Sequence, residues 1–256
     1  MRGIYGACLI GLAWATACSP KEPGPLNLRY EVVDDGGAVQ LNWDKIEGAD
    51  YYRIEVDGDS VAGIKETTYT VSVPCKSISV SAVGTDSSAS LSFELVPSLS
   101  VKIWSKRDPD TSHPWLVLFD TAGSAIPVGS KDKLGAAWYM NDDAADTARF
   151  YTNWSGEGGW NPQLGAWFAL SSDSLSAIKI APPPGSYFPD LPHDSRLTEG
   201  MIGIFWIDAG PDNAVGTGDH FGKMVITEYR SADPTYPSAT ADIYLQREPL
   251  LRWLVD

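Results

Sequence analysis

Basic residues, histidine and cysteine are all scarce in this 256-residue sequence. Lys and Arg number 19 against 33 Asp and Glu, which gives a formal net charge of −14. Because an acidic surface repels phosphate backbones, nucleic acid is not expected as a partner. The three histidines and three cysteines show no His-x-x-x-His or Cys-x-x-Cys spacing, so a zinc site has little support. No Gly-x-Ser-x-Gly is present, which excludes the nucleophile elbow of an α/β-hydrolase at the sequence level.

Long hydrophobic runs are also lacking. The apolar run Ile4–Ala15 follows Arg2 and is too short for a bilayer core of about 30 Å, which needs about 20 apolar residues. It fits the apolar region of a signal peptide instead. The sequence Ala-Thr-Ala-Cys that ends at Cys18 resembles the lipobox of bacterial lipoproteins, in which the cysteine is lipidated and becomes the new N-terminus. An ordinary signal peptide cut after Ala17 is the alternative.

This leader implies export and attachment to a membrane through an N-terminal lipid. Residues 1–17 are expected to be a signal peptide, and residues 18–25, which include the Pro-rich stretch Lys21–Pro25, a lipidated tether. Ser19 rather than an aspartate follows the cysteine, which in lipoproteins of Gram-negative bacteria implies the outer membrane or the cell surface. If Cys18 carries lipid, Cys75 has no partner for a disulfide, so the fold depends on its hydrophobic core.

The abundant residue types favour an all-β, turn-rich chain, with ten tryptophans, eleven tyrosines, 24 glycines and 18 prolines. From residue 26 onward, apolar and polar residues alternate, which is the period of a strand with one face in a core. The alternating sets are Leu28/Tyr30/Val32, Val39/Leu41/Trp43, Tyr52/Ile54/Val56, Tyr69/Val71/Val73, Ile78/Val80/Ala82 and Leu91/Phe93/Leu95. Six or seven such short strands, separated by turn signals, predict a two-sheet sandwich over residues 26–97.

Part of this region is similar to a fibronectin type III domain. The stretch AVQLNWDKIEGADYYRIEVDG (38–58) resembles strands B and C of that family, with Trp43 in the place of the buried B-strand tryptophan and Tyr52 on strand C. The stretch TTYTVSVPCKSISVSAVG (67–84) resembles the E-to-F region. Lys76 occupies the position where the family places a tyrosine that ties down the E–F corner. The resemblance implies a spacer or interaction module and carries no expectation of catalysis.

Residues 98–256 hold a second set of strand patterns, behind a junction at Val96-Pro97-Ser98. The candidate strands are Val101–Trp104, Trp115–Phe119, Ala136–Met140, Arg149–Asn153, Ala166–Leu170, Ala177–Ile180, Met201–Ile207, Lys223–Tyr229 and Asp242–Gln246. No amphipathic segment of helical length with clear caps is present, although Asp142–Ala148 and Pro249–Val255 can each form a short helix or turn. A second β-sandwich or an open barrel is therefore predicted.

The end of the chain carries a further, local resemblance. The stretch GDHFGKMVITEY (218–229), followed by ADIYLQ (241–246), resembles a terminal hairpin of surface lipoproteins in the haem-binding HmuY-like group. It implies haem as an alternative ligand, with His113 and His220 as two axial ligands if they meet in space. His193-Asp194-Ser195 places three triad residue types side by side. Because neighbours on an extended chain point in different directions, no working triad is expected there.

One acidic loop has the composition of a calcium site. Asp208, Asp212, Asn213 and Asp219 bring carboxylates and an amide into a Gly-rich stretch, and hard cations prefer several such oxygens. The spacing is not that of an EF-hand, and a polar loop without a ligand is the alternative. A third interpretation of the acidic residues is a glycan-acting hydrolase that uses a carboxylate pair in the second domain. Apart from calcium and haem, no cofactor is expected.

Tryptophan is unusually frequent in the second domain. Eight tryptophans lie beyond residue 97, and Trp154 and Trp160 flank the polar stretch Ser-Gly-Glu-Gly-Gly. Exposed indoles can stack on sugar rings, and the amide of Asn161 can hydrogen-bond their hydroxyls, so these three residues are the candidate ligand-binding set. The alternative is that the indoles fill the core. The sequence thus predicts a lipid-anchored protein with a non-enzymatic binding or structural role, whose ligand is a glycan or a protein.

Overall fold

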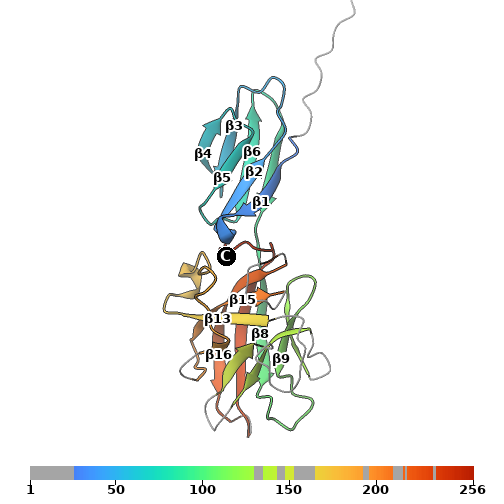
Figure 1. Cartoon of the computed structure of the whole chain (residues 1–256), viewed down its shortest axis with the longest axis vertical. Coiled ribbons are helices and arrows are strands. Elements are labelled where there is room, and N and C mark those ends of the chain that lie inside the picture. Colours follow the sequence, from blue (N-terminus) through green and yellow to red (C-terminus); the bar gives the residue numbers. More distant parts are fainter. Residues whose placement is uncertain are drawn as a thin grey trace, which may run out of the picture.

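Antiparallel β-strands make up nearly all of the regular structure (Figure 1). The computed structural model describes residues 26–129, 135–142, 148–152, 165–192, 196–209, 216, 218–232 and 235–256. Within these residues seventeen strands form four sheets, and the helical segments are the 3-10 turns η1 (Asp34–Gly36) and η3 (Leu175–Ala177). The predicted all-β fold is confirmed. No helix in this part of the chain has the length and apolar composition needed to cross a membrane.

Seven strands form the first sandwich. A three-stranded sheet of order β1–β2–β5 packs against a four-stranded sheet of order β4–β3–β6–β7. The bounds are β1 Arg29–Val33, β2 Ala38–Asn42, β3 Tyr51–Val56, β4 Asp59–Ile64, β5 Thr68–Val71, β6 Ser77–Val83 and β7 Ser88–Ser92. As the alternation predicted, Leu41, Ile54 and Val80 are buried in the shared core. Val73 is instead 66% exposed, because β5 ends two residues before it.

Side-chain hydrogen bonds hold the corners of the first sandwich. Trp43 is buried and packs edge-on against Tyr52, with ring centroids 5.4 Å apart. The Tyr52 hydroxyl accepts the backbone N–H of Ile46 at 2.8 Å. At the corner before β6, the backbone N–H groups of Lys76 and of the next residue both donate to Asp57 Oδ1 at 2.9 Å. Asp57 therefore ties down the corner at which the fibronectin type III pattern would place a tyrosine.

The second sandwich has two five-stranded sheets, of order β10–β9–β11–β12–β14 and β13–β15–β16–β17–β8. The bounds are β8 Leu95–Trp104, β9 Leu116–Phe119, β10 Ala125–Val128, β11 Ala136–Asn141, β12 Arg149–Thr152, β13 Gly165–Ser171, β14 Asp190–Leu191, β15 Ile202–Asp208, β16 His220–Arg230 and β17 Ser238–Gln246. Every candidate strand overlaps one of these except Ala177–Ile180. That stretch ends η3 and continues as a loop, in which Ile180 forms a single bridge with Trp253.

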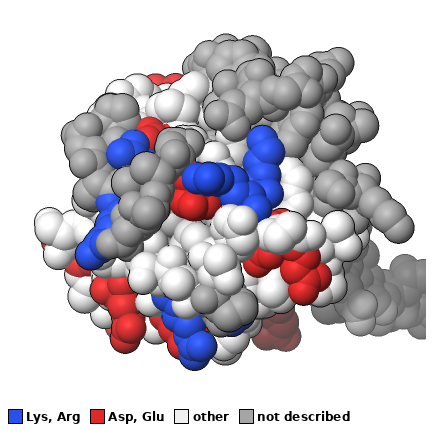
Figure 2. Space-filling model, turned by 90° about the horizontal axis from the view of Figure 1, so that it is seen from below, with Lys and Arg blue, Asp and Glu red and all other residues white. Residues whose placement is uncertain are grey.

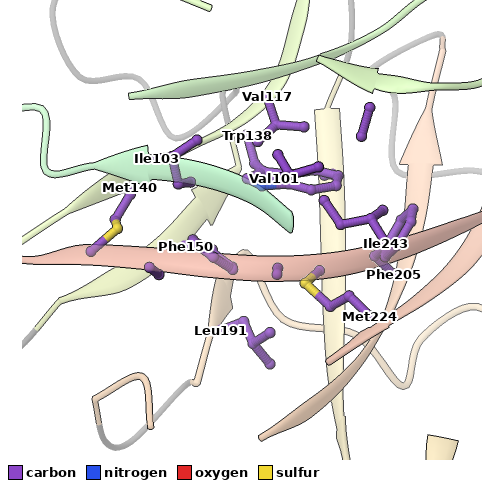
Figure 3. Close-up of a cluster of buried hydrophobic side chains, with 14 of the residues drawn as sticks. Val101, Ile103, Val117, Trp138, Met140, Phe150, Leu191, Phe205, Met224 and Ile243 are labelled. Atoms are coloured by element: carbon purple, nitrogen blue, oxygen red, sulfur yellow. The ribbon is translucent and has the colours of Figure 1, made fainter. Parts of the chain in front are cut away.

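Large side chains from both sheets meet in the core of the second sandwich (Figure 3). Trp138 from β11 is fully buried, and its ring lies 5.1 Å from that of Phe205 on β15. Gly222 on β16 makes this packing possible, because a Cβ atom at this position would lie 2.2 Å from Cζ of Phe205. The core thus requires a residue without a side chain directly beneath a large ring.

Almost no linker separates the two sandwiches. β7 ends at Ser92, Phe93 is buried in the core of the first sandwich, and β8 begins at Leu95. The expected junction at Val96-Pro97-Ser98 therefore lies within a strand of the second sandwich, where Val96 pairs with Leu245. The alternating pattern predicted that Leu95 continues the strand of Leu91 and Phe93, and this is wrong, because Leu95 begins β8.

The end of the chain, Leu250–Leu254, returns to the first sandwich. Leu251 and Trp253 are fully buried in the core of that sandwich. Nε1 of Trp253 donates to the Gly37 carbonyl at 3.0 Å, and the Trp253 carbonyl accepts a hydrogen bond from the Gln246 amide at 2.7 Å. One residue thus joins the core of the first sandwich to the last strand of the second.

Main-chain hydrogen bonds extend this connection on both sides. The Arg252 N–H donates to the Gly36 carbonyl at 3.0 Å, and the Arg252 carbonyl accepts the Ala181 N–H at 2.8 Å. Leu254 packs with the second sandwich, so side chains alternate between the two bodies as they do along a strand. Of the two forms expected for Pro249–Val255, a short helix or a turn, the structure shows a turn at residues 249 and 250. Leu251 and Trp253 lie in the core of the first sandwich, although residues 98–256 were expected to form the second domain.

Lys223 on β16 holds the same region together from the side of the second sandwich. Its side chain is fully buried, and Nζ donates to the carbonyls of Leu175 and Ile178, at 3.0 and 3.2 Å, and to the carboxylate of Asp256. Burial lowers the pKa of Lys223, and the carboxylate of Asp256 opposes that shift. The three acceptors match the three N–H bonds of an ammonium group, so this lysine is a structural link.

We expect the replacement Trp253→Ala to lower the free energy of unfolding by about 3–5 kcal/mol, the range for truncating a buried tryptophan. Because Trp253 couples the two sandwiches, the variant should also unfold in two separate steps. Urea unfolding followed by fluorescence and circular dichroism measures both effects. Phe188→Ala, at a side chain that is 47% exposed, is the control and should change stability by less than about 0.5 kcal/mol. A wild-type unfolding curve for Trp253→Ala would contradict this role.

Candidate functional site

Several residues that the sequence predicts as functional lie outside the described part of the chain. They are Cys18, Trp154, Trp160, Asn161, Asp212 and Asn213. The triad-like stretch 193–195 lies outside it as well. Asp208, Asp219, His113 and His220 are described, and the structure decides which of them lie together.

The hairpin between β15 and β16 is built around the carboxylate of Asp219, which is 1% exposed. Its Oδ2 accepts hydrogen bonds from Nε1 of Trp206 at 3.0 Å and from the Gly216 N–H at 2.9 Å. Its Oδ1 accepts the Ala209 N–H at 2.9 Å. Three donors from both sides of the hairpin therefore converge on one carboxylate, which anchors the loop to its strands.

Burial raises the pKa of the Asp219 carboxyl, and the neighbouring Asp208 raises it further, while the three N–H donors act in the opposite direction. Among the described residues, no group of three or more His, Cys, Asp or Glu is arranged to hold a metal ion. The calcium site stays a prediction. It was predicted at Asp208, Asp212, Asn213 and Asp219, and Asp212 and Asn213 lie outside the described residues. Asp208 and Asp219 are both buried, so this pair is not placed to attack a glycan substrate.

The two described histidines lie at opposite ends of the second sandwich. His113 stacks on Trp104, with ring centroids 4.3 Å apart, and Trp104 pairs with Ser238 at the start of β17. Nδ1 of His220 is 3.0 Å from the carbonyl of Gln246 at the end of β17. Eight residues of strand separate these points by roughly 25 Å. His113 and His220 therefore cannot be the two axial ligands of one haem. The prediction that these two residues bind haem together is wrong.

The tryptophans of the second domain are divided between the cores and the surface. Trp138, Trp206 and Trp253 are buried, which agrees with the alternative that the indoles fill the core. Trp104, Trp115 and Trp167 are only partly buried. Packing thus explains part of the number of tryptophans in the sequence.

A cluster of aromatic rings lies on the outer surface of the sheet that contains β9, β11 and β12. Trp138 and Met140 of β11 point into the core, so Tyr139 between them points outward. Its ring stacks on that of Tyr151 on β12, at 5.5 Å between centroids, and meets Trp115 edge-on at 6.1 Å. We call Trp115, Tyr139 and Tyr151 the aromatic face.

A lysine completes the aromatic face. Nζ of Lys106 lies 5.2 Å from the ring centroid of Tyr139 and 5.9 Å from that of Trp115, which are cation–π distances. Tyr139 is buried, whereas Trp115 and Tyr151 are partly exposed. β12 ends at Thr152, so the sequence continues from this face directly into the segment with Trp154 and Trp160. The alternating pattern did not reveal this face, because both sides of β11 are apolar.

The far end of the second sandwich carries charges of both signs (Figure 2). Basic and acidic side chains are interspersed over its described surface. Asp142, whose acidic sequence neighbours are typical of a solvated turn, is in fact buried; it accepts a hydrogen bond from the Ser105 hydroxyl, and its Oδ2 lies 3.6 Å from Nη1 of Arg107. This end shows no continuous basic patch among the described residues.

Hollows are found near the junction between the sandwiches. One, with a volume of about 370 Å³, is lined by residues that include Lys76 from the first sandwich and Pro97 and Tyr244 from the second. Another, of about 270 Å³, lies within the second sandwich beside His220 and Arg247. Small ligands bind preferentially at domain interfaces and at the ends of sheets, so these hollows are binding-site candidates in addition to the aromatic face.

Comparison with known proteins adds no relative. No protein-family model matches the sequence, and no curated protein matches it. The case for a function therefore depends on the geometry described above.

We expect Asp219→Ala to lower the free energy of unfolding by about 1–3 kcal/mol, because three N–H donors lose a buried acceptor. A carboxyl with a raised pKa binds its proton more tightly in the folded state. The unfolding free energy of the wild type therefore falls as pH rises from about 4 through the folded-state pKa, and the variant lacks this component.

The difference in unfolding free energy between the wild type and Asp219→Ala should thus be largest near pH 4 and should decrease as pH rises. Urea unfolding at a series of pH values measures it. Asp173→Ala, at an exposed residue, is the matched control and should follow the wild-type profile. Equal stabilities of wild type and Asp219→Ala at every pH would refute the anchoring role.

Proposed function

We propose that this protein is an exported, lipid-anchored binding protein of the cell surface, and that the aromatic face of its second sandwich recognises a glycan. The observation that carries this proposal is the position of Trp115, Tyr139 and Tyr151 on the side of their sheet that faces away from the main core of the sandwich. A sandwich packs its large side chains between its sheets, so stacked rings on an outer surface serve another purpose.

The chemistry of the aromatic face suits sugars. Partly exposed rings offer flat apolar surfaces to the C–H faces of a sugar, and polar groups beside them can bind its hydroxyls. Arg149 and Asp190 supply such groups: they form an ion pair at 2.9 Å, and both lie on the same side of the sheet as Tyr151. The sequence places Trp154, Trp160 and Asn161 immediately after β12, which would add two indoles and an amide.

The first sandwich suits the role of a spacer. Its three-plus-four arrangement of strands and the packing of Trp43 on Tyr52 support the proposed kinship with fibronectin type III domains. β1 runs towards η1, which contacts the C-terminal segment at the junction, so the chain enters the first sandwich from the side away from the second (Figure 1). A tether before residue 26 would therefore hold the second sandwich away from the membrane.

Replacing Trp115 by alanine should weaken glycan binding about tenfold or more, as the loss of a central aromatic contact does. Tyr151→Ala should have a smaller effect in the same direction. Binding to a glycan array, followed by titration with the best ligand, measures both. Trp167→Ala is the matched control, because Trp167 is also partly buried but lies on the opposite sheet.

The double variant Trp154→Ala/Trp160→Ala extends the test to the adjoining segment and should also reduce glycan binding. Unaltered binding by both this variant and Trp115→Ala would exclude the aromatic face as the glycan site. A different result would be that the protein binds no glycan but binds another protein, and that the same variants lose this binding. The aromatic face would then remain the binding site, but its proposed ligand would be wrong.

The lipid anchor has its own test. The Cys18→Ser variant should lose labelling by a fatty-acid analogue and move from the detergent phase to the aqueous phase when cell extracts are partitioned, because one cysteine is proposed to carry the lipid. Cys75→Ser is the matched control and should keep the lipid, since Cys75 is buried in the first sandwich. Continued lipid labelling of Cys18→Ser would rule out this anchor.

A further inference from the structure

A cavity of about 270 Å³ opens at the end of the second sandwich nearest the junction. It lies between the β9–β10 turn, the start of β16 and the end of β17. Its apolar wall is formed by Phe119, Ile207 and Leu245, and its polar residues include Asp120, His220 and Arg247. The volume exceeds the roughly 150 Å³ of an engineered cavity that binds benzene, and it approaches the roughly 300 Å³ at which natural ligand pockets begin.

The strand register places the two basic residues side by side. Gly222 of β16 pairs with Leu245 of β17, so two residues further along His220 lies opposite Arg247. Residues two apart on a strand share a face, which puts both on the side of Leu245, a core residue. Directly opposed side chains on neighbouring strands are close enough to bind one ligand group together.

His220 presents a free ring nitrogen. Its Nδ1 is 3.0 Å from the carbonyl oxygen of Gln246, which can only accept, so Nδ1 carries the hydrogen. Nε2 makes no hydrogen bond to any described residue. The imidazole is thus held in one orientation by the backbone of β17 while its second nitrogen remains available.

Arg247 has no carboxylate partner among the described residues, although most arginines of the second sandwich interact with the protein. Its guanidinium forms no ion pair or hydrogen bond within the described part of the chain. Four other arginines face a carboxylate, in the pairs Arg29–Asp44, Arg107–Asp142, Arg149–Asp190 and Arg230–Glu228. In a chain with a net charge of −14, a cation without a carboxylate partner at a cavity is a site for an anion from outside.

The opposite wall is pre-organised. Oδ1 of Asp120 accepts the N–H groups of Ala122 and Ser124 at 2.9 Å each, and the Asp120 carbonyl accepts the Gly123 N–H at 2.9 Å. These bonds fix the β9–β10 turn and leave Oδ2 of Asp120 without a partner among the described residues. A carboxylate oxygen held in this way can accept hydrogen bonds from hydroxyl groups of a ligand.

We propose that this cavity binds a sugar acid of monosaccharide size. The ligand carboxylate lies against Arg247 and Nε2 of His220, its hydroxyls donate to Asp120, and its ring covers Phe119 and Leu245. A sugar acid is the class that uses all three polar groups and the apolar wall together. This site is separate from the aromatic face, and the proposal stands whether or not that face binds a glycan.

The test is calorimetric titration of the purified protein with galacturonate, with galactose as the neutral counterpart and alanine as a small zwitterion. Galacturonate should bind at least about tenfold more tightly than galactose, and added salt should weaken its binding. Arg247→Gln should reduce galacturonate binding to the level of galactose, and His220→Gln should weaken it in part. Arg230→Gln, at the other end of β16, is the matched control and should bind like the wild type.

Any of the following results would overturn the proposal. The first is no galacturonate binding by the wild type at millimolar concentrations, and the second is equal binding of galacturonate and galactose. The third is unchanged binding by Arg247→Gln, a variant at an exposed side chain whose fold is checked by its unfolding curve. Tighter binding of alanine than of galacturonate would reject the sugar-acid class. Loss of binding in Trp115→Ala but not in Arg247→Gln would assign galacturonate to the aromatic face and overturn this site.

Discussion

The indole of Trp253 lies in the core of the first sandwich while its own carbonyl is held by the last strand of the second. Together with the short connection between Phe93 and Leu95, this gives two chain crossings between the bodies. A single short linker allows rotation about its axis, whereas a second crossing with hydrogen bonds on both sides does not. The two sandwiches are therefore held to each other at two places, which fixes the positions of the cavity and the aromatic face relative to the first sandwich.

Two buried charged groups of the second sandwich, those of Lys223 and Asp219, have all their hydrogen-bonding positions filled by the protein itself. Lys223 has three acceptors and Asp219 has three donors, so each holds a loop or the C-terminal segment in place. Such groups stabilise a fold only when all their partners are present. The guanidinium of Arg247 and Nε2 of His220, which make no hydrogen bond to a described residue, lie instead at a cavity.

Much of the fold could be predicted from the sequence, because the two-residue period of a strand is a local property. Strands with one apolar face, such as the one that carries Ile54, were predicted well. The path of the C-terminal segment could not be predicted: Leu251 and Trp253 alternate as in any strand, and Gly37, which receives the Trp253 N–H, is 216 residues away. The aromatic face was missed because Tyr139 lies between two apolar neighbours, so the period does not tell which face is inside.

The haem ligation predicted for His113 and His220 is wrong for a different reason, and calcium at the acidic loop stays a prediction. Residue types report which atoms are available for binding but not whether the fold already uses them. The carboxylate of Asp219 is occupied by N–H groups of its own hairpin, and His113 and His220 are separated by the length of a strand. Only the coordinates distinguish an oxygen that anchors a loop from one that awaits a ligand.

The place of Trp253 in the first sandwich also determines the order of assembly. The strands of that sandwich leave the ribosome first, yet a space in their core remains open until residues 250–254 have been made. Domains that emerge early usually fold as units during synthesis, whereas this one must wait for the end of its own chain. Any chain cut short before residue 250 is therefore left with an incomplete core in its first sandwich.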